Sequence, residues 1–109
     1  MKIALTAKEC RADSPMDQRF GRSPCFAFAD TETGVLEFAD NPNAAAGSGA
    51  GIGSAEFLSR RGVQAVVTGD VGPKASRALA AAGITAYLAG ADTVEENLAA
   101  FTRGELDPL

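Results

Sequence analysis

The two cysteines, Cys10 and Cys25, are the residues in this chain that are best suited to bind a soft metal. Soft metals and iron–sulfur clusters prefer sulfur ligands, and the sequence contains no histidine that could serve instead. Two thiolates cannot enclose a standard cluster. A bound cluster would therefore need exogenous ligands or a second subunit, or it would be bound only transiently. The alternative is that Cys25 is an ordinary strand residue and that Cys10 is merely exposed. We expect free thiols or metal ligands, not a disulfide.

The long segment between the two cysteines contains two arginines that could bind an anion. Arg19 and Arg22 flank an aromatic residue and a glycine, and together they could clamp a negatively charged group. The alternative is that they form internal ion pairs with Asp13 and Asp17 and thereby order a long loop. The candidate cofactor-binding residues of this segment are Arg19, Phe20, Gly21 and Arg22.

Two glycine-bearing segments could contribute backbone N–H groups to the same anion. The stretch 47–54 has no glycine triplet with the dinucleotide-binding spacing, although Asp70 follows at about the distance of a ribose-binding acid. The stretch 69–74 lacks the spacing of a phosphate-binding P-loop, but it places a glycine, a proline and a lysine at an expected helix start. Close packing of small residues and a plain solvated turn are the alternatives. The candidates here are Gly49, Gly51, Gly72 and Lys74.

The first half of the chain is expected to form strands and one helix. Gly34 lies in an expected tight turn between two apolar runs, which together indicate a β-hairpin. After Asn41-Pro42 the composition shifts to Ala and Gly, so we expect a loop over 43–53 and then a helix that ends at Gly62. The expected strands are residues 2–7, 25–30 and 35–39.

The second half repeats one pattern. Gly62, Gly83 and Gly104 are spaced 21 residues apart, and the first two precede short apolar runs. This pattern predicts helix-ending glycines followed by buried strands, and hence two consecutive βα units. Pro73 suits the first turn of one helix, and residues 93–96 have the spacing of a capping box for the last helix.

These elements predict an α/β fold in the order βββαβαβα. Right-handed crossovers after the third and fourth strands give a five-stranded mixed sheet with the order 3-2-1-4-5, in which only the second strand is antiparallel to the others. The carboxyl ends of four strands then share one edge, where ligands of open α/β sheets bind. The same topology brings Cys10 and Cys25 together at this edge.

Composition narrows the class of function. With 109 residues and 46% hydrophobic residues, we expect one domain spanning residues 1–109. The formal charge of −4 argues against nucleic-acid binding. The apolar run at the N-terminus is too short for a signal peptide or a membrane span, so we expect a cytoplasmic protein that does not bind membranes. The absence of histidine removes the usual general base, the Ser/His and Cys/His nucleophile pairs and every imidazole metal site.

Three motifs together resemble the dinitrogenase iron-molybdenum cofactor biosynthesis family. They are Ser14-Pro15-Met16-Asp17-Gln18-Arg19-Phe20-Gly21-Arg22, Gly49-Ala50-Gly51-Ile52 and Thr68-Gly69-Asp70-Val71-Gly72-Pro73-Lys74-Ala75. The resemblance extends over essentially the whole chain and implies a ribonuclease H-like fold. The first strand lacks the central acid that two-metal nuclease chemistry would need, so nuclease activity is not expected.

The resemblance implies a carrier protein related to nitrogen fixation and not an enzyme. Its cargo would be a transiently bound iron–sulfur or molybdenum–iron–sulfur cluster, either the iron-molybdenum cofactor, its iron–sulfur precursor or a related molybdenum-containing cluster. The implied partners are cluster-donor and cluster-acceptor proteins, and we expect a monomer or a weak dimer. Some relatives use a histidine near the cluster and this chain has none, so binding would fall to Cys10 and Cys25 as metal ligands or to non-covalent capture by Arg side chains and backbone N–H groups. The alternative is a regulatory module whose glycine-rich loops bind a nucleotide or phosphometabolite.

Overall fold

A single five-stranded sheet forms the centre of the molecule. The computed structural model describes all 109 residues. The strand order is β3-β2-β1-β4-β5. Strand β2 is antiparallel to both of its neighbours, while β4 is parallel to β1 and to β5. The predicted topology is therefore confirmed. The elements are β1 (Lys2–Ala7), β2 (Cys25–Asp30), β3 (Leu36–Asp40), α1 (Ala50–Arg60), β4 (Ala65–Thr68), α2 (Pro73–Ala81), β5 (Thr85–Leu88) and α3 (Val94–Thr102).

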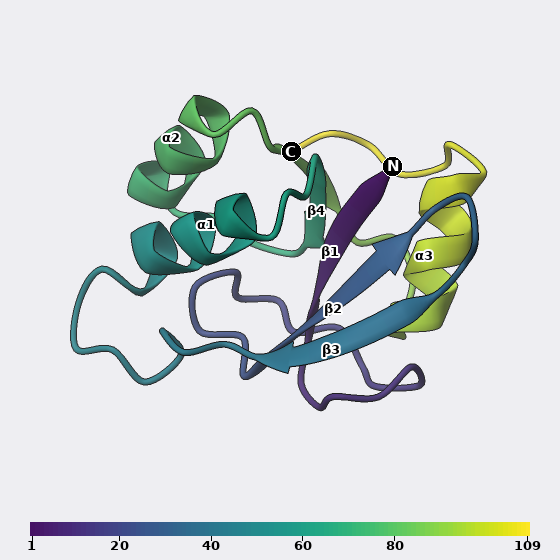
Figure 1. Ribbon diagram of the computed structural model, residues 1–109, viewed down its shortest axis with the longest axis horizontal. Helices are drawn as coiled ribbons and strands as arrows, with labels where there is room; N and C mark the ends of the chain where they lie inside the picture. Colours follow the sequence, from purple (N-terminus) through teal and green to yellow (C-terminus); the bar gives the residue numbers. More distant parts are fainter.

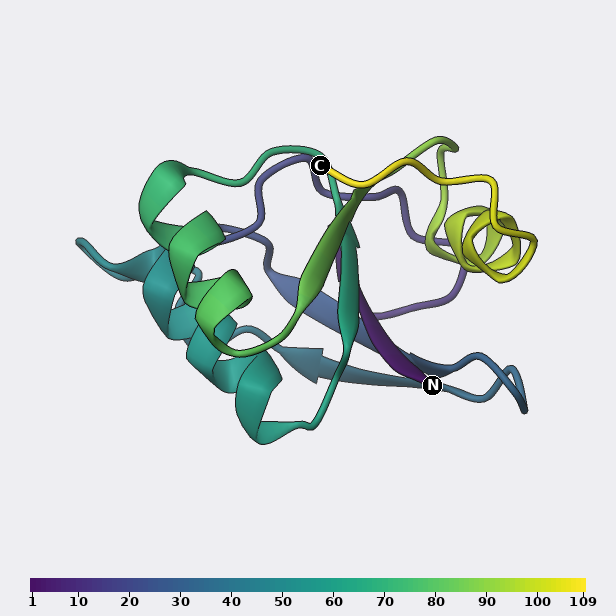
Figure 2. The ribbon, with the colours of Figure 1, turned by 90° about the horizontal axis from the view of Figure 1, so that it is seen from above.

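Helices cover both faces of the sheet, so the three central strands β2, β1 and β4 are buried from two sides. Helices α1 and α2 lie on one face and α3 lies on the other (Figure 1), and the view from above shows the sheet between them (Figure 2). The core on the α1–α2 face is built around Phe26 and Phe28 of β2, with Leu58 and Leu79 from the helices. The core on the α3 face contains Ile3, Leu5, Val67 and Val94.

The repeated glycines end the three helices. Gly62, Gly83 and Gly104 have φ angles of 72°, 74° and 73°, and each follows shortly after the end of a helix. This left-handed conformation is strained for residues with a Cβ atom, which is why glycine occurs at each of these positions. The predicted helix ends are confirmed. Strand β4 begins at Ala65 and β5 at Thr85, and the backbone N–H of Thr85 donates to the carbonyl of Gln64 at 3.1 Å, just before β4.

Helix α3 begins with the predicted capping box. The backbone N–H of Glu96 donates to Thr93 Oγ1 at 3.2 Å, and the Glu96 carboxylate accepts from the Thr93 backbone N–H at 3.0 Å. The Thr93 hydroxyl also donates to this carboxylate, and these hydrogen bonds lower the pKa of Glu96 below its ordinary value. Backbone N–H groups at the start of helix α3 therefore have hydrogen-bond acceptors within the helix's own first turn.

The C-terminal residues cover the open edge of β5. The backbone N–H of Leu88 donates to the carbonyl of Asp107 at 2.8 Å, and the N–H of Leu109 donates to the carbonyl of Ala86 at 2.9 Å. An antiparallel bridge joins Tyr87 to Pro108 between these two bonds. No helix in the structure has both the length and the apolar character needed to cross a membrane.

Candidate functional site

A cavity of about 460 Å³ lies at the carboxyl edge of the sheet, between the start of α1 and the start of α2. Its volume is within the usual range for small-molecule sites. All eight residues that the sequence predicts to bind a cofactor line this cavity, together with five others. The lining residues are Arg19, Phe20, Gly21, Arg22, Gly49, Ala50, Gly51, Ile52, Asp70, Gly72, Pro73, Lys74 and Ala75.

Two helix N-termini without caps meet at the cavity. Neither Gly49, which precedes α1, nor Gly72, which precedes α2, provides a side-chain cap, and neither helix has an acidic residue in its first turn. The backbone N–H groups of Ala50, Gly51 and Ile52 donate to no group in the protein. Helix N-termini carry a partial positive charge and favour anions. By contrast, α3 is capped and has two glutamates in its first turn, and it lies away from the cavity.

Small residues hold the walls of the cavity close together. A Cβ atom on Gly51 would lie 2.8 Å from the Cβ of Ala75, so glycine allows the first turns of α1 and α2 to lie side by side. A Cβ atom on Gly21 would lie 2.7 Å from the backbone nitrogen of Gly51. Gly21 and Gly51 therefore shape the site by permitting close backbone contact, as the alternative based on packing supposed.

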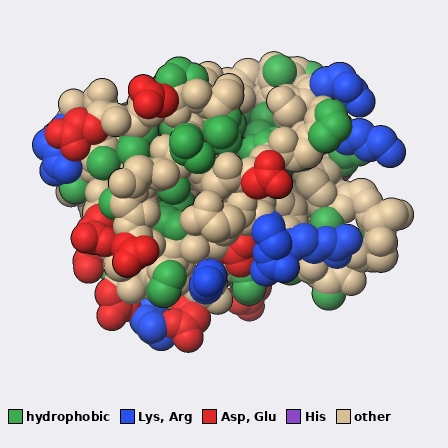
Figure 3. All heavy atoms as spheres, turned by 180° about the vertical axis from the view of Figure 1, so that it is seen from behind, with side chains coloured by type: hydrophobic (Ala, Val, Ile, Leu, Met, Phe, Trp, Pro, Cys, Tyr) green, Lys and Arg blue, Asp and Glu red, His purple; other side chains and the backbone are tan.

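Basic side chains gather around the cavity. Figure 3 shows Lys and Arg side chains beside a projecting loop, and those that line the cavity are Arg19, Arg22 and Lys74. Lys74, in the first turn of α2, forms no salt bridge within the protein. Asp70 is the one acidic residue among those lining the cavity, so the side chains there carry a net positive charge on a chain whose formal charge is −4.

Arg19 is oriented by Asp17. Its backbone N–H donates to Asp17 Oδ1 at 2.8 Å, and its Nη2 lies 3.2 Å from Asp17 Oδ2. The hydrogen bonds to this carboxylate, together with the attraction between the two charges, raise the pKa of Arg19 above its ordinary value. The Arg19 side chain nevertheless remains 65% exposed, so it can still reach a ligand. The predicted pairing of Arg19 with Asp17 is confirmed.

Arg22 is held by the loop before α1 and not by an aspartate. Its Nη1 donates to the carbonyl of Ala44 at 3.2 Å and also to the carbonyl of Ala46. The expected ion pair between this segment's arginines and Asp13 is absent, because Asp13 pairs with Arg11 at 2.8 Å. Arg22 therefore connects the wall of the cavity to the glycine-rich loop.

A buried polar network that the sequence did not reveal fixes this wall. Asn41 Nδ2 donates to the carbonyls of Gly21 and Ser23, at 3.2 and 3.0 Å, and to Ser54 Oγ at 3.1 Å. Ser54 lies on α1, so the network ties the arginine-bearing segment to the helix that forms the opposite wall. The Asn41-Pro42 step was the available signal, but it indicated only where the composition shifts to Ala and Gly.

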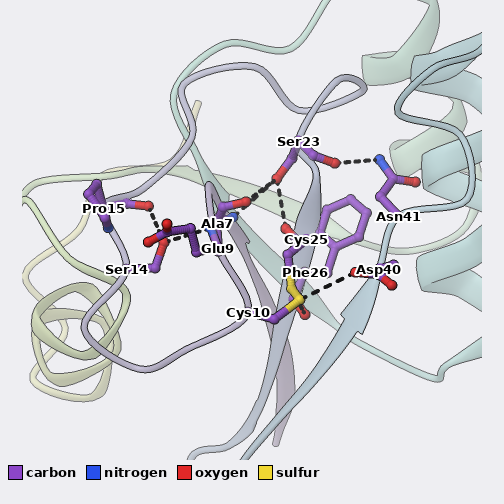
Figure 4. Close-up of a disulfide and its surroundings, with 10 residues drawn as sticks. All are labelled: Ala7, Glu9, Cys10, Ser14, Pro15, Ser23, Cys25, Phe26, Asp40 and Asn41. Atoms are coloured by element: carbon purple, nitrogen blue, oxygen red, sulfur yellow. Dashed lines mark hydrogen bonds between the residues drawn. A yellow bond between two sulfur atoms is a disulfide. The ribbon is translucent and has the colours of Figure 1, made fainter.

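Cys10 and Cys25 lie together at the carboxyl edge, but they form a disulfide (Figure 4). The expectation of free thiols is therefore wrong for this structure, and no group of three or more His, Cys, Asp or Glu side chains is arranged to hold a metal ion. Their Cα atoms are 5.6 Å apart, within the usual disulfide range. The reason is geometric, since β1 ends beside the start of β2. Neither cysteine lines the cavity.

The segment enclosed by the disulfide has other anchors. The backbone N–H of Met16 donates to the carbonyl of Asp92 at 2.9 Å, and the N–H of Asp17 donates to the carbonyl of Thr6 at 3.0 Å. Ser23 Oγ donates to the carbonyl of Ala7 at 3.1 Å. These bonds attach the segment to the sheet and to the turn before α3, so its position does not depend on the disulfide alone.

The fold and the cavity define a small α/β protein with an electropositive site at the carboxyl edge of its sheet. The family model described as "Dinitrogenase iron-molybdenum cofactor" matches residues 1–104. This chain belongs to that family.

Similar proteins support this assignment. The structure of the apo form of the orange protein from Desulfovibrio gigas superposes with a TM-score of 0.94 and 36% identity, covering 99% of this chain and 92% of that one. A NifB-like protein from Thermotoga gives a TM-score of 0.85 and 32% identity, with the same coverage. The uncharacterized protein MJ0580 from Methanocaldococcus jannaschii is 30% identical over 110 residues, covering 98% of this chain and 90% of that protein.

Proposed function

We propose that this protein binds an anionic metal–sulfur cluster, or an iron–sulfur or molybdenum-containing precursor, and passes it on during cofactor assembly. The observation that carries this proposal is the meeting of two uncapped helix N-termini and the unpaired Lys74 at one cavity. The family description names a molybdenum- and iron-containing cofactor, which agrees with a cargo of this kind. The role is binding and transfer without catalysis, in exchange with cluster-donor and cluster-acceptor proteins.

The chemistry of the cavity suits a cargo that must leave. Sulfide-bridged clusters carry negative charge on their sulfur atoms, which can accept hydrogen bonds from backbone N–H groups and from Lys and Arg side chains. The cavity offers such donors from α1, α2 and the arginine-bearing segment, and none of its lining residues is a cysteine. Hydrogen bonds and charge attraction hold an anion without covalent bonds to the metal, so release breaks no metal–ligand bond.

A nucleotide or phosphometabolite remains a second candidate, because one observation favours it. Asp70, at about the sequence distance of a ribose-binding acid, lines the same cavity as Gly49 and Gly51. Phosphate groups also bind at helix N-termini. The glycine spacing does not match the dinucleotide fingerprint, however.

The test is anaerobic loading with iron, sulfide and molybdate, followed by gel filtration and absorption spectroscopy. We expect the wild-type protein to retain a charge-transfer absorption. Lys74→Glu should lower the affinity at least about tenfold, because it replaces attraction by repulsion at the cavity. A glutamate in the first turn of α2 is compatible with the helix dipole, so the loss would reflect binding and not unfolding.

Arg77→Glu is the matched control. Arg77 lies on the same helix, is exposed and does not line the cavity, and the substitution makes the same change in net charge. It should load like the wild type. If both variants load like the wild type, the cavity does not hold the cargo. If the wild type retains no absorption but binds ATP or inorganic phosphate in a manner that Lys74→Glu abolishes, the second candidate replaces the first.

A further inference from the structure

The outer surface of α1 and α2 carries a groove that is separate from the anion cavity. Helix α1 follows β3 and α2 follows β4, and both begin at the carboxyl edge, so the two helices run side by side in the same direction (Figure 1). The groove between them has a volume of about 460 Å³. Most of the side chains that line it are small or apolar, and they include Ile52, Ala55 and Ser59 from α1 and Ala78, Ala81 and Ala82 from α2 and its end.

The shape of this groove suits a helix as the occupant. Ile52, Ala55 and Ser59 follow one another at intervals of three and four residues, so they form one stripe along α1. A groove between two parallel helices accepts a ridge of side chains with the same spacing on a third helix. Ile52, which is 37% exposed, is the one exposed large hydrophobic residue on the two helices. The surface therefore receives apolar side chains but lacks the projecting apolar side chains that insert into a bilayer.

The same two helices carry positive charge that the protein does not neutralise. Arg60, Lys74 and Arg77 are exposed and form no salt bridge, whereas three arginines elsewhere each pair with an acidic residue close in the sequence. Glu56 is the only one of the 14 acidic residues that lies on these helices. Figure 3 shows basic side chains gathered on the side of these helices and acidic ones gathered on the opposite side. This asymmetry attracts and orients a partner with an acidic surface.

The groove adjoins the anion cavity. Ile52 lines both of them. Arg60, eight residues later on α1, also lines the groove, so the groove extends roughly 12 Å along the helix. A partner that lies in the groove therefore has its own surface next to a bound cargo, as transfer between two proteins requires.

We propose that α1 and α2 form the docking surface for the proteins that donate or accept the cargo, and that the docked element is an acidic amphipathic helix. Its apolar side chains occupy the groove, and its carboxylates pair with Arg60 and with Arg77, which lies one turn before Ala81. Glu56 repels the same carboxylates and limits the affinity, which suits a partner that must dissociate. That the partner exchanges cargo rests on the proposed function, whereas the surface itself does not.

The test uses a synthetic helical peptide of about 18 residues as the probe, with leucines at positions i, i+3, i+4 and i+7 and glutamates beside them. A second peptide has lysine in place of every glutamate. Amide NMR spectra of the labelled protein, recorded without cargo during titration, locate the binding and measure its affinity. We expect the acidic peptide to shift the amide signals of the groove residues and to bind at least about tenfold more tightly than the basic peptide.

Two neutralising substitutions should have opposite effects on binding of the acidic peptide. Arg60→Gln should weaken it about two- to fivefold, and Glu56→Gln should strengthen it by a similar factor, because each removes one exposed charge. Partial unfolding could not produce effects of opposite sign. Lys8→Gln is the matched control, since Lys8 is also exposed and unpaired but lies in the segment that bridges to the turn before α3. It should bind the peptide like the wild type.

The proposal is wrong if neither peptide binds, if both bind alike, or if Arg60→Gln binds the acidic peptide no more weakly than Lys8→Gln. It is also wrong if Lys74→Glu abolishes binding of the peptide while Arg60→Gln does not, because the peptide then occupies the anion cavity. Vesicles of phosphatidylglycerol that bind through Arg60 when the peptide does not would replace the protein partner by a membrane. Arg60→Gln should load cargo like the wild type, so this proposal and the proposed function can fail separately.

Discussion

Replacing Gly21 by alanine is expected to reduce anion capture more than tenfold and to lower the free energy of unfolding by about 1–3 kcal/mol. The added Cβ would lie 2.7 and 2.8 Å from the nitrogen and Cα of Gly51 and 3.0 Å from the carbonyl carbon of Ala50. These are backbone atoms of a helix, so they cannot rotate away as a flexible side chain could. The arginine-bearing segment and α1 must then move apart. Chemical denaturation and the loading assay measure the two effects.

Gly47→Ala is the matched control for this substitution. A Cβ on Gly47 meets no atom within 4 Å, although the residue lies in the same glycine-rich region. It should therefore leave both stability and loading near the wild-type values. Equal stability and loading of the two variants would show that the close contact between Gly21 and α1 does not shape the cavity.

Reduction of the disulfide should lower the free energy of unfolding by about 3 kcal/mol, as expected for a loop closed between residues 15 apart in the sequence. For a domain of this size, the melting temperature should fall by roughly 10 to 20 °C. The physical reason is that the bond restricts the unfolded chain, while hydrogen bonds hold the enclosed segment in the folded state. Thermal unfolding with and without a phosphine measures this difference in the absence of metal.

The Cys10→Ser/Cys25→Ser variant controls for direct effects of the reductant. It should melt near the reduced wild type, and the phosphine should not change its melting temperature. A wild-type melting temperature that is insensitive to the phosphine, with both thiols shown to be free by a thiol reagent, would contradict a stabilising role for the bond.

Local signals in the sequence were sufficient to predict most of the fold. Gly62 and Gly83 end helices by adopting a backbone conformation that other residues avoid, and the Thr93–Glu96 capping box starts a helix through contacts three residues apart. Helix-ending glycines and capping boxes each involve only a few residues that are close in the sequence, so they can be recognised from the sequence. Combined with the handedness of crossover connections, they left one strand order, which the structure confirms.

The place of the site could be predicted, but the bonding of its members could not. The strand order places the loops at the carboxyl edge next to one another, and the predicted residues therefore line one cavity. The contacts of Arg22 with backbone carbonyls depend on the path of loops without regular structure. The same holds for the side chain that approaches Cys10. The expected compartment favoured free thiols, whereas proximity between the ends of strands determines whether the Cys10–Cys25 bond can form, so the sequence-based prediction was wrong.

The short tail after α3 protects the molecule against unwanted self-association. Its backbone pairs with Ala86 and Leu88, so the last strand of the sheet presents no row of free N–H and C=O groups on that side. Removing residues 107–109 would expose those groups and turn β5 into a template on which a second chain could add a strand.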